Sequence, residues 1–152
     1  MPSRQAREVM VSPVITCRRS DKLREVAALF VRHTISGVPV VDREGRLCGI
    51  ITKHDLLGLI LPDYLELFAD IDFIRDFSVL LSCNLDVLES DLLLAEDVMS
   101  YEPLKVKPET ALMKCAALLH QHRADILCVV DPEGRLLGVL TTTDIARAFF
   151  GG

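Results

Sequence analysis

The chain has 152 residues, of which 50% are hydrophobic, and its formal net charge is −5. This length and composition suit one compact domain made of small sub-units and argue against a disordered chain. The apolar runs are shorter than the roughly 18 residues that cross a bilayer, and the basic start of the chain has no apolar core behind it. We therefore expect a soluble, cytoplasmic protein without a membrane partner.

The charge is unevenly distributed. Residues 1–57 carry ten basic and six acidic side chains, residues 58–97 carry one basic and ten acidic, and residues 98–152 carry six of each. An acidic middle segment disfavours nucleic acid as a partner, because a phosphate backbone needs a continuous basic surface. The basic first third of the chain remains compatible with a small anionic ligand.

The five cysteines are odd in number, scattered, and never arranged as C-x-x-C. This pattern argues against a disulfide framework and a zinc site, and each cysteine lies in an apolar stretch where it can act as a small hydrophobe. No cluster with metal-ligand spacing and no Ser–His–Asp or Cys–His signature is present in the sequence. We therefore expect no metal, no catalytic cofactor and no enzymatic activity.

Residues 8–56 recur without a gap at residues 97–145, with 17 identities over 49 aligned positions. One copy of about fifty residues is too small to bury a sufficient core alone. Two copies packed together can do so, and a pseudo-symmetric pair leaves clefts along the internal interface. The repeat therefore predicts both the fold and the place of a ligand site.

Each copy has the same order of predicted elements: a short strand, a helix, two strands joined by a turn, and a second helix. Ser20 and Thr110 are the expected N-caps of the first helices. Each turn ends in a glycine, which suits the left-handed position that closes a tight turn. In the first copy the elements are an apolar segment at 10–17, a helix from Leu23, a strand at 37–41, a turn at 42–45, a strand at 47–52 and a helix from Lys53; the second copy repeats them 89 residues later.

Between the copies, an acidic segment shows helical spacing of apolar residues such as Phe68, Phe73 and Phe77. It is expected to form a helical cap over the interface between the copies or, alternatively, a docking surface for a partner. The predicted organisation is thus a first repeat at 1–57, a helical inter-repeat segment at 58–96 and a second repeat at 97–152.

The second helix of each copy begins with a threonine followed three residues later by an aspartate: Thr52 and Asp55, then Thr141 and Asp144. Such a pair forms a capping box, in which each side chain accepts a backbone N–H of the other residue. The same carboxylate could also accept hydrogen bonds from the two hydroxyls of a ribose. The free N–H groups at the helix start would attract a phosphate, and neighbouring glycines would let a ligand approach the backbone.

These motifs resemble those of tandem CBS (cystathionine β-synthase) domains, also called a Bateman module. The resemblance rests on Ser36-Gly37-Val38-Pro39-Val40-Val41-Asp42 followed by Gly49-Ile50-Ile51-Thr52-x-x-Asp55, and it covers about two thirds of the chain. It implies two β-α-β-β-α repeats packed through their sheets, with clefts that bind adenosine-containing ligands. The implied site residues are Thr34, Ile35, Ser36, Gly37, Val38, Pro39, Thr52, His54 and Asp55 in the first repeat, and Asp125, Ile126, Leu127, Thr141, Thr143 and Asp144 in the second.

The second copy departs from the motif, because Asp125-Ile126-Leu127-Cys128 replaces Ser36-Gly37-Val38-Pro39. The loss of the glycine narrows access to the backbone, and Asp125 would repel a phosphate. We therefore predict tighter binding in a cleft lined by residues 34–39 and 52–55.

The resulting hypothesis is a regulatory, energy-sensing module that binds AMP, ADP or ATP and signals to a separate effector protein by conformational change. The alternatives are a protein-interaction module with vestigial clefts, or a sensor of S-adenosylmethionine or NAD. A homodimer is expected, because more apolar surface is present than two small repeats can bury. The residues concerned are Leu57, Leu59, Ile60, Leu61, Phe149 and Phe150.

Overall fold

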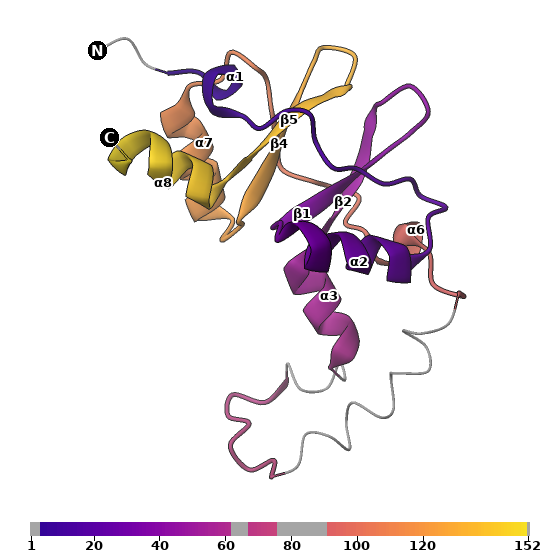
Figure 1. The fold of residues 1–152 in the computed structure, drawn as a ribbon. Coiled ribbons are helices and arrows are strands. Elements are labelled where there is room, and N and C mark those ends of the chain that lie inside the picture. The colour runs from indigo at the N-terminus through magenta and orange to yellow at the C-terminus, as the bar shows by residue number, and fades with distance from the viewer. Residues whose placement is uncertain (1–3, 62–66, 76–90, 152) are drawn as a thin grey trace.

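The computed structural model describes residues 4–61, 67–75 and 91–151 and contains the two predicted repeats (Figure 1). Each repeat is preceded by one short helix. The opening strand is a single parallel bridge between Cys17 and Val40 in the first repeat and a two-residue strand in the second. The elements are α1 (Ala6–Val9), α2 (Leu23–His33), β1 (Gly37–Val41), β2 (Leu47–Thr52), α3 (Lys53–Ile60), α6 (Ala95–Val98), β3 (Lys105–Val106), α7 (Leu112–Gln121), β4 (Ile126–Val130), β5 (Leu136–Thr141) and α8 (Thr142–Phe150).

The two hairpins have the same register. Gly37 pairs with Thr52 in the antiparallel β1–β2 pair, as Ile126 pairs with Thr141 in β4–β5, and both pairs carry a bulge one residue before the turn-side end of the first strand. Because successive strand residues point to opposite faces, each strand supplies two different cores. The predicted α/β class and the two pseudo-symmetric repeats are confirmed.

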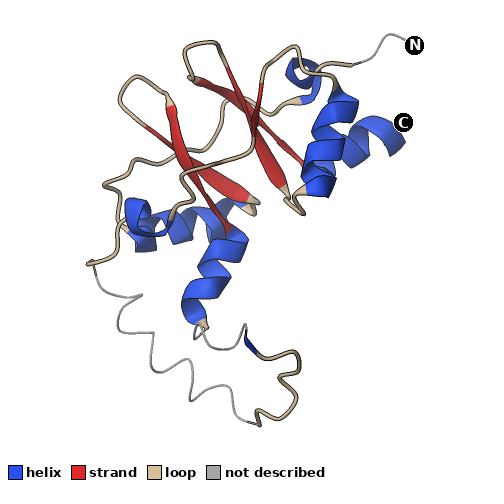
Figure 2. Ribbon diagram, turned by 180° about the vertical axis from the view of Figure 1, so that it is seen from behind, coloured by secondary structure: helices blue, strands red, loops and turns tan. Residues whose placement is uncertain are grey.

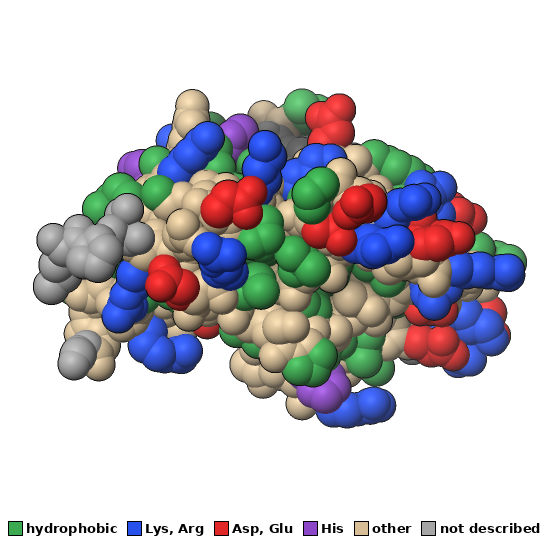
Figure 3. Space-filling model, turned by 90° about the horizontal axis from the view of Figure 1, so that it is seen from above, with side chains coloured by type: hydrophobic (Ala, Val, Ile, Leu, Met, Phe, Trp, Pro, Cys, Tyr) green, Lys and Arg blue, Asp and Glu red, His purple; other side chains and the backbone are tan. Residues whose placement is uncertain are grey.

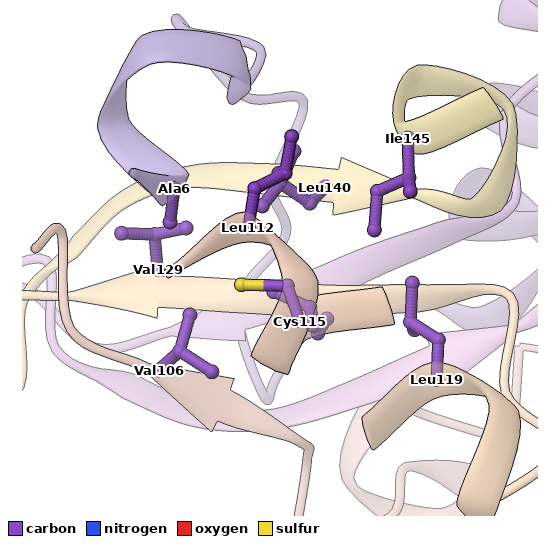
Figure 4. Close-up of a cluster of buried hydrophobic side chains, with 9 residues drawn as sticks. Ala6, Val106, Leu112, Cys115, Leu119, Val129, Leu140 and Ile145 are labelled. Atoms are coloured by element: carbon purple, nitrogen blue, oxygen red, sulfur yellow. The ribbon is translucent and has the colours of Figure 1, made fainter. Parts of the chain in front are cut away.

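One face of each sheet packs against the helices of its own repeat. In the second repeat, Leu127 and Val129 of β4 and Leu140 of β5 meet Leu112 and Cys115 of α7 (Figure 4). The first repeat forms the matching cluster from Val38, Val40 and Ile51 with α2. The helices therefore cover the outer faces of the two sheets (Figure 2).

The opposite faces of the two sheets pack against each other. Ile50 of the first repeat forms one buried cluster with Ile126, Cys128 and Val139 of the second. The hairpins are also joined at their turn-side ends, where Leu47 N donates to Gly134 O at 2.9 Å. The repeats are thus packed through their sheets, as predicted.

The short helices cross over between the repeats. Helix α1, which precedes the first repeat in sequence, packs on the second through Ala6, whose N–H donates to Thr110 O at 2.8 Å. Helix α6 packs in the same way on the first repeat, where Ala95 N donates to Asp21 O at 2.8 Å. Figure 1 shows α1 beside α7 and α8, and α6 beside α2.

This crossover explains why the predicted N-caps are wrong. Helices α2 and α7 begin after Lys22 and Ala111, with no side-chain cap. Their first N–H groups instead donate to backbone carbonyls of the crossing segments, Leu23 to Leu93 and Leu112 to Arg4. Thr110 accepts from Lys107 N in a preceding turn, so its hydroxyl is used elsewhere.

The predicted helix around Phe68 and Phe73 is also wrong for residues 68–75, which form turns and bends. Asp70 Oδ1 accepts from Asp72 N at 2.9 Å, a local bond that competes with helical hydrogen bonding. The two phenylalanine rings meet edge to face, with centroids 5.2 Å apart. Phe77 lies outside the described residues.

The end of the molecule that carries the hairpin turns is charged but not predominantly basic. Lys and Arg side chains are interspersed there with Asp and Glu (Figure 3). This face therefore lacks the continuous positive surface that a nucleic acid backbone requires. Among the described residues, no helix has both the length and the apolar character needed to cross a membrane.

Candidate functional site

Both predicted capping boxes are present. At the start of α3, Asp55 Oδ2 accepts from Thr52 N at 2.8 Å and from the Thr52 hydroxyl at 3.0 Å, while Asp55 N donates to Thr52 Oγ1 at 3.3 Å. At the start of α8, Asp144 Oδ2 accepts from Thr141 N at 2.9 Å. The boxes hold each carboxylate at the first turn of a helix, at the edge of a cleft.

Two small clefts lie between the repeats, and each combines the helix start of one repeat with the strand-opening loop of the other. The Asp144 cleft has a volume of about 290 Å³, and the Asp55 cleft of about 250 Å³. The Asp144 cleft is lined by Val11, Pro13, Val14, Ile15, Thr34, Ile35, Ser36, Gly37, Ile126, Val139, Thr141, Thr143 and Asp144. The Asp55 cleft is lined by Ser36, Ile50, Thr52, Lys53, His54, Asp55, Ser100, Glu102, Pro103, Leu104, Arg123, Ala124, Asp125 and Ile126.

The sequence-based grouping of residues 34–39 with residues 52–55 in one cleft is therefore wrong. The loop of the first repeat faces Asp144, and the loop of the second repeat, with Asp125, faces Asp55. Ser36 lines both clefts because its carbonyl accepts from Lys53 N at 3.2 Å, which holds the loop beside α3. The predicted ranking of the clefts loses its basis with this regrouping.

Three of the implied site residues belong to the core. Val38, Pro39 and Leu127 are fully buried and line neither cleft. Val38 and Leu127 point from their strands into the helix–sheet clusters, because they alternate with the residues that face the other repeat. The other twelve implied residues line one or both clefts.

The repeated glycines have a different role from the expected one. A Cβ on Gly49 would lie 2.5 Å from Ser100 O, and one on Gly138 would lie 2.7 Å from Met10 Sδ. The chain segments that cross between the repeats run over these glycines, with Ile50 N donating to Ser100 O and Val11 N to Val139 O. At these two glycines the backbone is therefore approached closely by another segment of the same chain, and not by a ligand.

The crossing segments supply the cleft residues that sequence reasoning missed. Val11 and Ile15 line the Asp144 cleft, and Ser100 and Leu104 line the Asp55 cleft. These pairs occupy matching positions in the two repeats, 89 residues apart. Their contacts depend on the crossover, which is a tertiary feature that neither spacing nor periodicity reports.

The two aspartates differ in their surroundings. Asp144 is buried, and its Oδ1 lies 3.6 Å from Nη1 of Arg147. The position of Arg147 in the first repeat is held by Gly58, so Asp55 lacks the matching cation. The Asp55 carboxylate is half-buried.

Cys17 and Cys128 behave as buried hydrophobic side chains. Burial raises the pKa of Cys17 and of Cys128 to about 12, with the Asp21 carboxylate adding to the effect at Cys17. These thiols are therefore protonated at neutral pH and are poor metal ligands or nucleophiles. Within the part of the chain that the structure describes, no group of three or more His, Cys, Asp or Glu residues is arranged to hold a metal ion.

The model of the CBS domain family matches the chain twice, over residues 6–62 and 95–151. The chain belongs to the CBS-domain family. The two matches coincide with the two repeats of the fold, so the chain carries a tandem CBS pair, and each cleft lies between its two CBS repeats.

Several known proteins are similar to this CBS pair. An uncharacterised protein of Methanocaldococcus jannaschii is 29% identical over 157 residues, which cover 93% of this chain and 89% of that protein. Inosine-5′-monophosphate dehydrogenase of the same organism is 27% identical over 144 residues, but the chain spans only 23% of its length. The crystal structure of CBSX2 from Arabidopsis thaliana in complex with AMP superposes with a TM-score of 0.73 at 25% identity, covering 97% of this chain and 96% of that one.

Proposed function

We propose that this CBS pair is a regulatory module that binds an adenine nucleotide (AMP, ADP or ATP) in its inter-repeat clefts and is not an enzyme. The observation that carries the proposal is the duplicated Thr-x-x-Asp capping box, which sets a carboxylate at the edge of a cleft in both repeats. The similar CBSX2 has been crystallised with AMP, which supports the same class of ligand here.

The chemistry of the clefts suits an adenosine group. Each carboxylate uses Oδ2 for its capping box. Oδ1 of Asp55 is the second oxygen available to a ribose hydroxyl, whereas Oδ1 of Asp144 would share a ribose hydroxyl with Nη1 of Arg147, which lies 3.6 Å away. Apolar side chains such as Ile35 and Ile126 in the Asp144 cleft can pack against the adenine ring. Hydrogen bonds to a charged acceptor contribute about 1.5–3 kcal/mol each, so these carboxylates would add substantially to binding.

The position of the clefts suits a regulatory role. Each cleft has one wall from each repeat, so a ligand that contacts both walls favours one relative placement of the repeats. Differential affinity for two such placements is what ligand-driven regulation requires. We therefore propose that the bound nucleotide alters the surface presented to an effector protein.

A thermal-shift screen against AMP, ADP, ATP, NAD and S-adenosylmethionine tests the proposal, because a ligand that binds only the folded state raises the Tm. We expect a shift with at least one adenine nucleotide and a smaller shift in the Asp55→Ala/Asp144→Ala double variant. If no compound at millimolar concentration shifts the wild-type Tm, the proposal is wrong. A larger effect of S-adenosylmethionine or NAD would instead identify a different ligand.

The second candidate is a protein-interaction module with vestigial clefts. It is favoured by Glu102 and Asp125, two acidic side chains that line the Asp55 cleft. Absence of any nucleotide shift, together with a partner that binds equally well with and without AMP, would support this alternative.

We also propose a homodimer formed through the helical faces. A groove of about 750 Å³ lies between α7 and α8, lined by apolar residues that include Leu119, Ile145 and Phe150. Phe150 is 88% exposed, and Val31 on the matching face of α2 is 86% exposed. Burial of such a patch against its own copy is typical of twofold dimers. Light scattering at micromolar concentration should give twice the mass of one chain, and Phe150→Ser should lower it.

A further inference from the structure

We propose that the two clefts select ligands by charge. The Asp55 cleft takes a phosphate-bearing adenine nucleotide, and the Asp144 cleft takes an uncharged adenine nucleoside such as adenosine or its 5′-methylthio derivative. This inference rests on the proposed function, since it divides that function between the two clefts. It follows from the pseudo-symmetry of the chain, which allows the cleft walls to be compared position by position.

Cationic side chains are found in only one of the two clefts. The left-handed residue that follows the first helix is Thr34 in the Asp144 cleft and Arg123 in the Asp55 cleft. The residue before the aspartate is Thr143 in the first case and His54 in the second, and Lys53 also lines the Asp55 cleft. Arg and Lys form charge-assisted hydrogen bonds with a phosphate, and an imidazole N–H of His54 can donate to it.

The Asp144 cleft offers a phosphate little compensation for lost hydration. Among its lining residues the one charged side chain is Asp144, whose Oδ1 is paired with Arg147 at 3.6 Å. Burying an unpaired charge against apolar side chains is costly. An uncharged 5′ group would instead pack against the apolar wall, which consists of Val11, Pro13, Val14, Ile15, Ile35, Ile126 and Val139.

Acidic residues in the Asp55 cleft disfavour phosphate binding, but the two clefts still differ in their cationic side chains. Glu102 and Asp125 occupy the positions of Pro13 and Ser36. Both acidic side chains are exposed, as are Lys53 and Arg123, so solvent and salt screen the repulsion and the attraction alike. The contrast that remains is that only the Asp55 cleft has Lys and Arg among its lining residues to donate to a phosphate, and phosphate binding there should therefore depend on Arg123.

The chain supplies matched substitutions for a test. Thr34 and Arg123 share the same left-handed backbone conformation, each with φ of 51°. An exchange of side chains between these positions therefore places at each a residue type that the same conformation already accepts elsewhere in the chain. Arg123→Thr removes a cation from the Asp55 cleft, and Thr34→Arg adds one to the Asp144 cleft.

Calorimetric titration of the full chain with AMP and with adenosine is the experiment, and Asp55→Ala and Asp144→Ala assign each signal to a cleft. We expect AMP binding to be lost in Asp55→Ala and adenosine binding to be lost in Asp144→Ala. Asp55→Asn and Asp144→Asn retain a capping acceptor and serve as replacements if an alanine variant does not fold.

The charge variants then test the cause of the selectivity. Arg123→Thr should weaken AMP binding about tenfold and leave adenosine binding unchanged, as expected for one charge-assisted contact. Thr34→Arg should raise the affinity of the Asp144 cleft for AMP. A rise in salt from about 50 to 200 mM should weaken AMP binding and leave adenosine binding nearly unaffected.

The outcomes separate this inference from the proposed function. If AMP binds both clefts equally, or if Arg123→Thr leaves AMP affinity unchanged, the charge selection is wrong although nucleotide binding stands. If AMP binds but adenosine and 5′-methylthioadenosine bind nowhere, the assignment of the Asp144 cleft is wrong. If none of the three compounds binds, the proposed function and the inference fail together.

Discussion

The hairpins and the cleft walls of this CBS pair have diverged to very different extents. Each hairpin contains Val-Val-Asp, Glu-Gly-Arg-Leu and a glycine at matching positions, and the two hairpins share one register and one bulge. The loops that line the clefts share no identity between 34–37 and 123–126. Duplication has thus preserved the hairpins and the Thr-x-x-Asp capping boxes, and it has allowed the loops that line the clefts to differ.

The shared turn positions make the same hydrogen bonds in both repeats. Asp42 Oδ1 accepts from Glu44 N and Arg46 N, and Asp131 accepts from the matching pair. These hydrogen bonds, led by the one from Arg46, hold the pKa of Asp42 below its usual value. Since the two repeats meet at these turns, each turn must keep its shape for the other to fit.

The largest expected effect is at a shared glycine under the crossing chain. Gly49→Ala would place a Cβ 2.5 Å from the Ser100 carbonyl oxygen, a backbone atom that cannot rotate away. We expect the free energy of unfolding to fall by about 2–3 kcal/mol, as for overpacked cores, measured by urea denaturation. The control is Gly58→Ala in α3, where nothing lies within 4 Å and a gain of about 0.5–1 kcal/mol is expected. Equal stabilities of the two variants would contradict the proposed role of Gly49.

The next effect is expected at Asp55, which matches Asp144 of the second repeat but has no neighbouring arginine like Arg147. Asp55→Ala should weaken AMP binding by about 1–3 kcal/mol, the scale of lost charge-assisted hydrogen bonds, measured by calorimetry. If the carboxylate only caps α3, the variant would lose stability but keep wild-type affinity once it is folded. That result would rule out a ribose-binding role for Asp55.

At Cys17, where the second repeat has Val106, we expect the stability of the fold to depend on pH. Since burial raises the pKa of Cys17 to about 12, this thiol ionises in the unfolded chain well before it ionises in the folded one. The Cys17 thiol therefore does not lower the free energy of unfolding at any pH below about 9. Above that pH, the free energy of unfolding falls by about 1.4 kcal/mol per pH unit, because the unfolded chain loses the thiol proton first. Cys17→Val, the residue type of matching position 106, should flatten the decline in stability between pH 9 and 10.5. An unchanged slope would show that Cys17 does not titrate in this way.

The smallest expected effect is at the hairpin turns. Gly45 and Gly134 have φ of +82° and +83°, and a Cβ on either would meet nothing within 4 Å. Alanine at either position should therefore cost only the backbone strain, about 1 kcal/mol. The two variants should differ by less than about 0.5 kcal/mol in urea denaturation. A larger difference would show that the two turns are not equivalent.

The sequence predicted the elements of each repeat but not how the repeats exchange segments. Apolar periodicity and turn chemistry are local, so the strands, the hairpins and the capping boxes at Thr52 and Thr141 could be predicted. The prediction of N-caps at Ser20 and Thr110 was wrong because backbone carbonyls from distant segments accept hydrogen bonds from the first N–H groups of those helices. The grouping of cleft residues failed for the same reason: which loop faces which helix is decided by packing between the repeats.

The crossover of α1 also has a consequence for the chain ends. Because α1 packs on the second repeat, the beginning of the described chain lies beside its last helix, and Arg4 Nη1 donates to Ala148 O at 3.3 Å (Figure 1). A polypeptide can therefore enter and leave this module at nearly the same point. Such adjacent ends allow a domain to be inserted within a loop of a larger protein without forcing the flanking parts of the host apart.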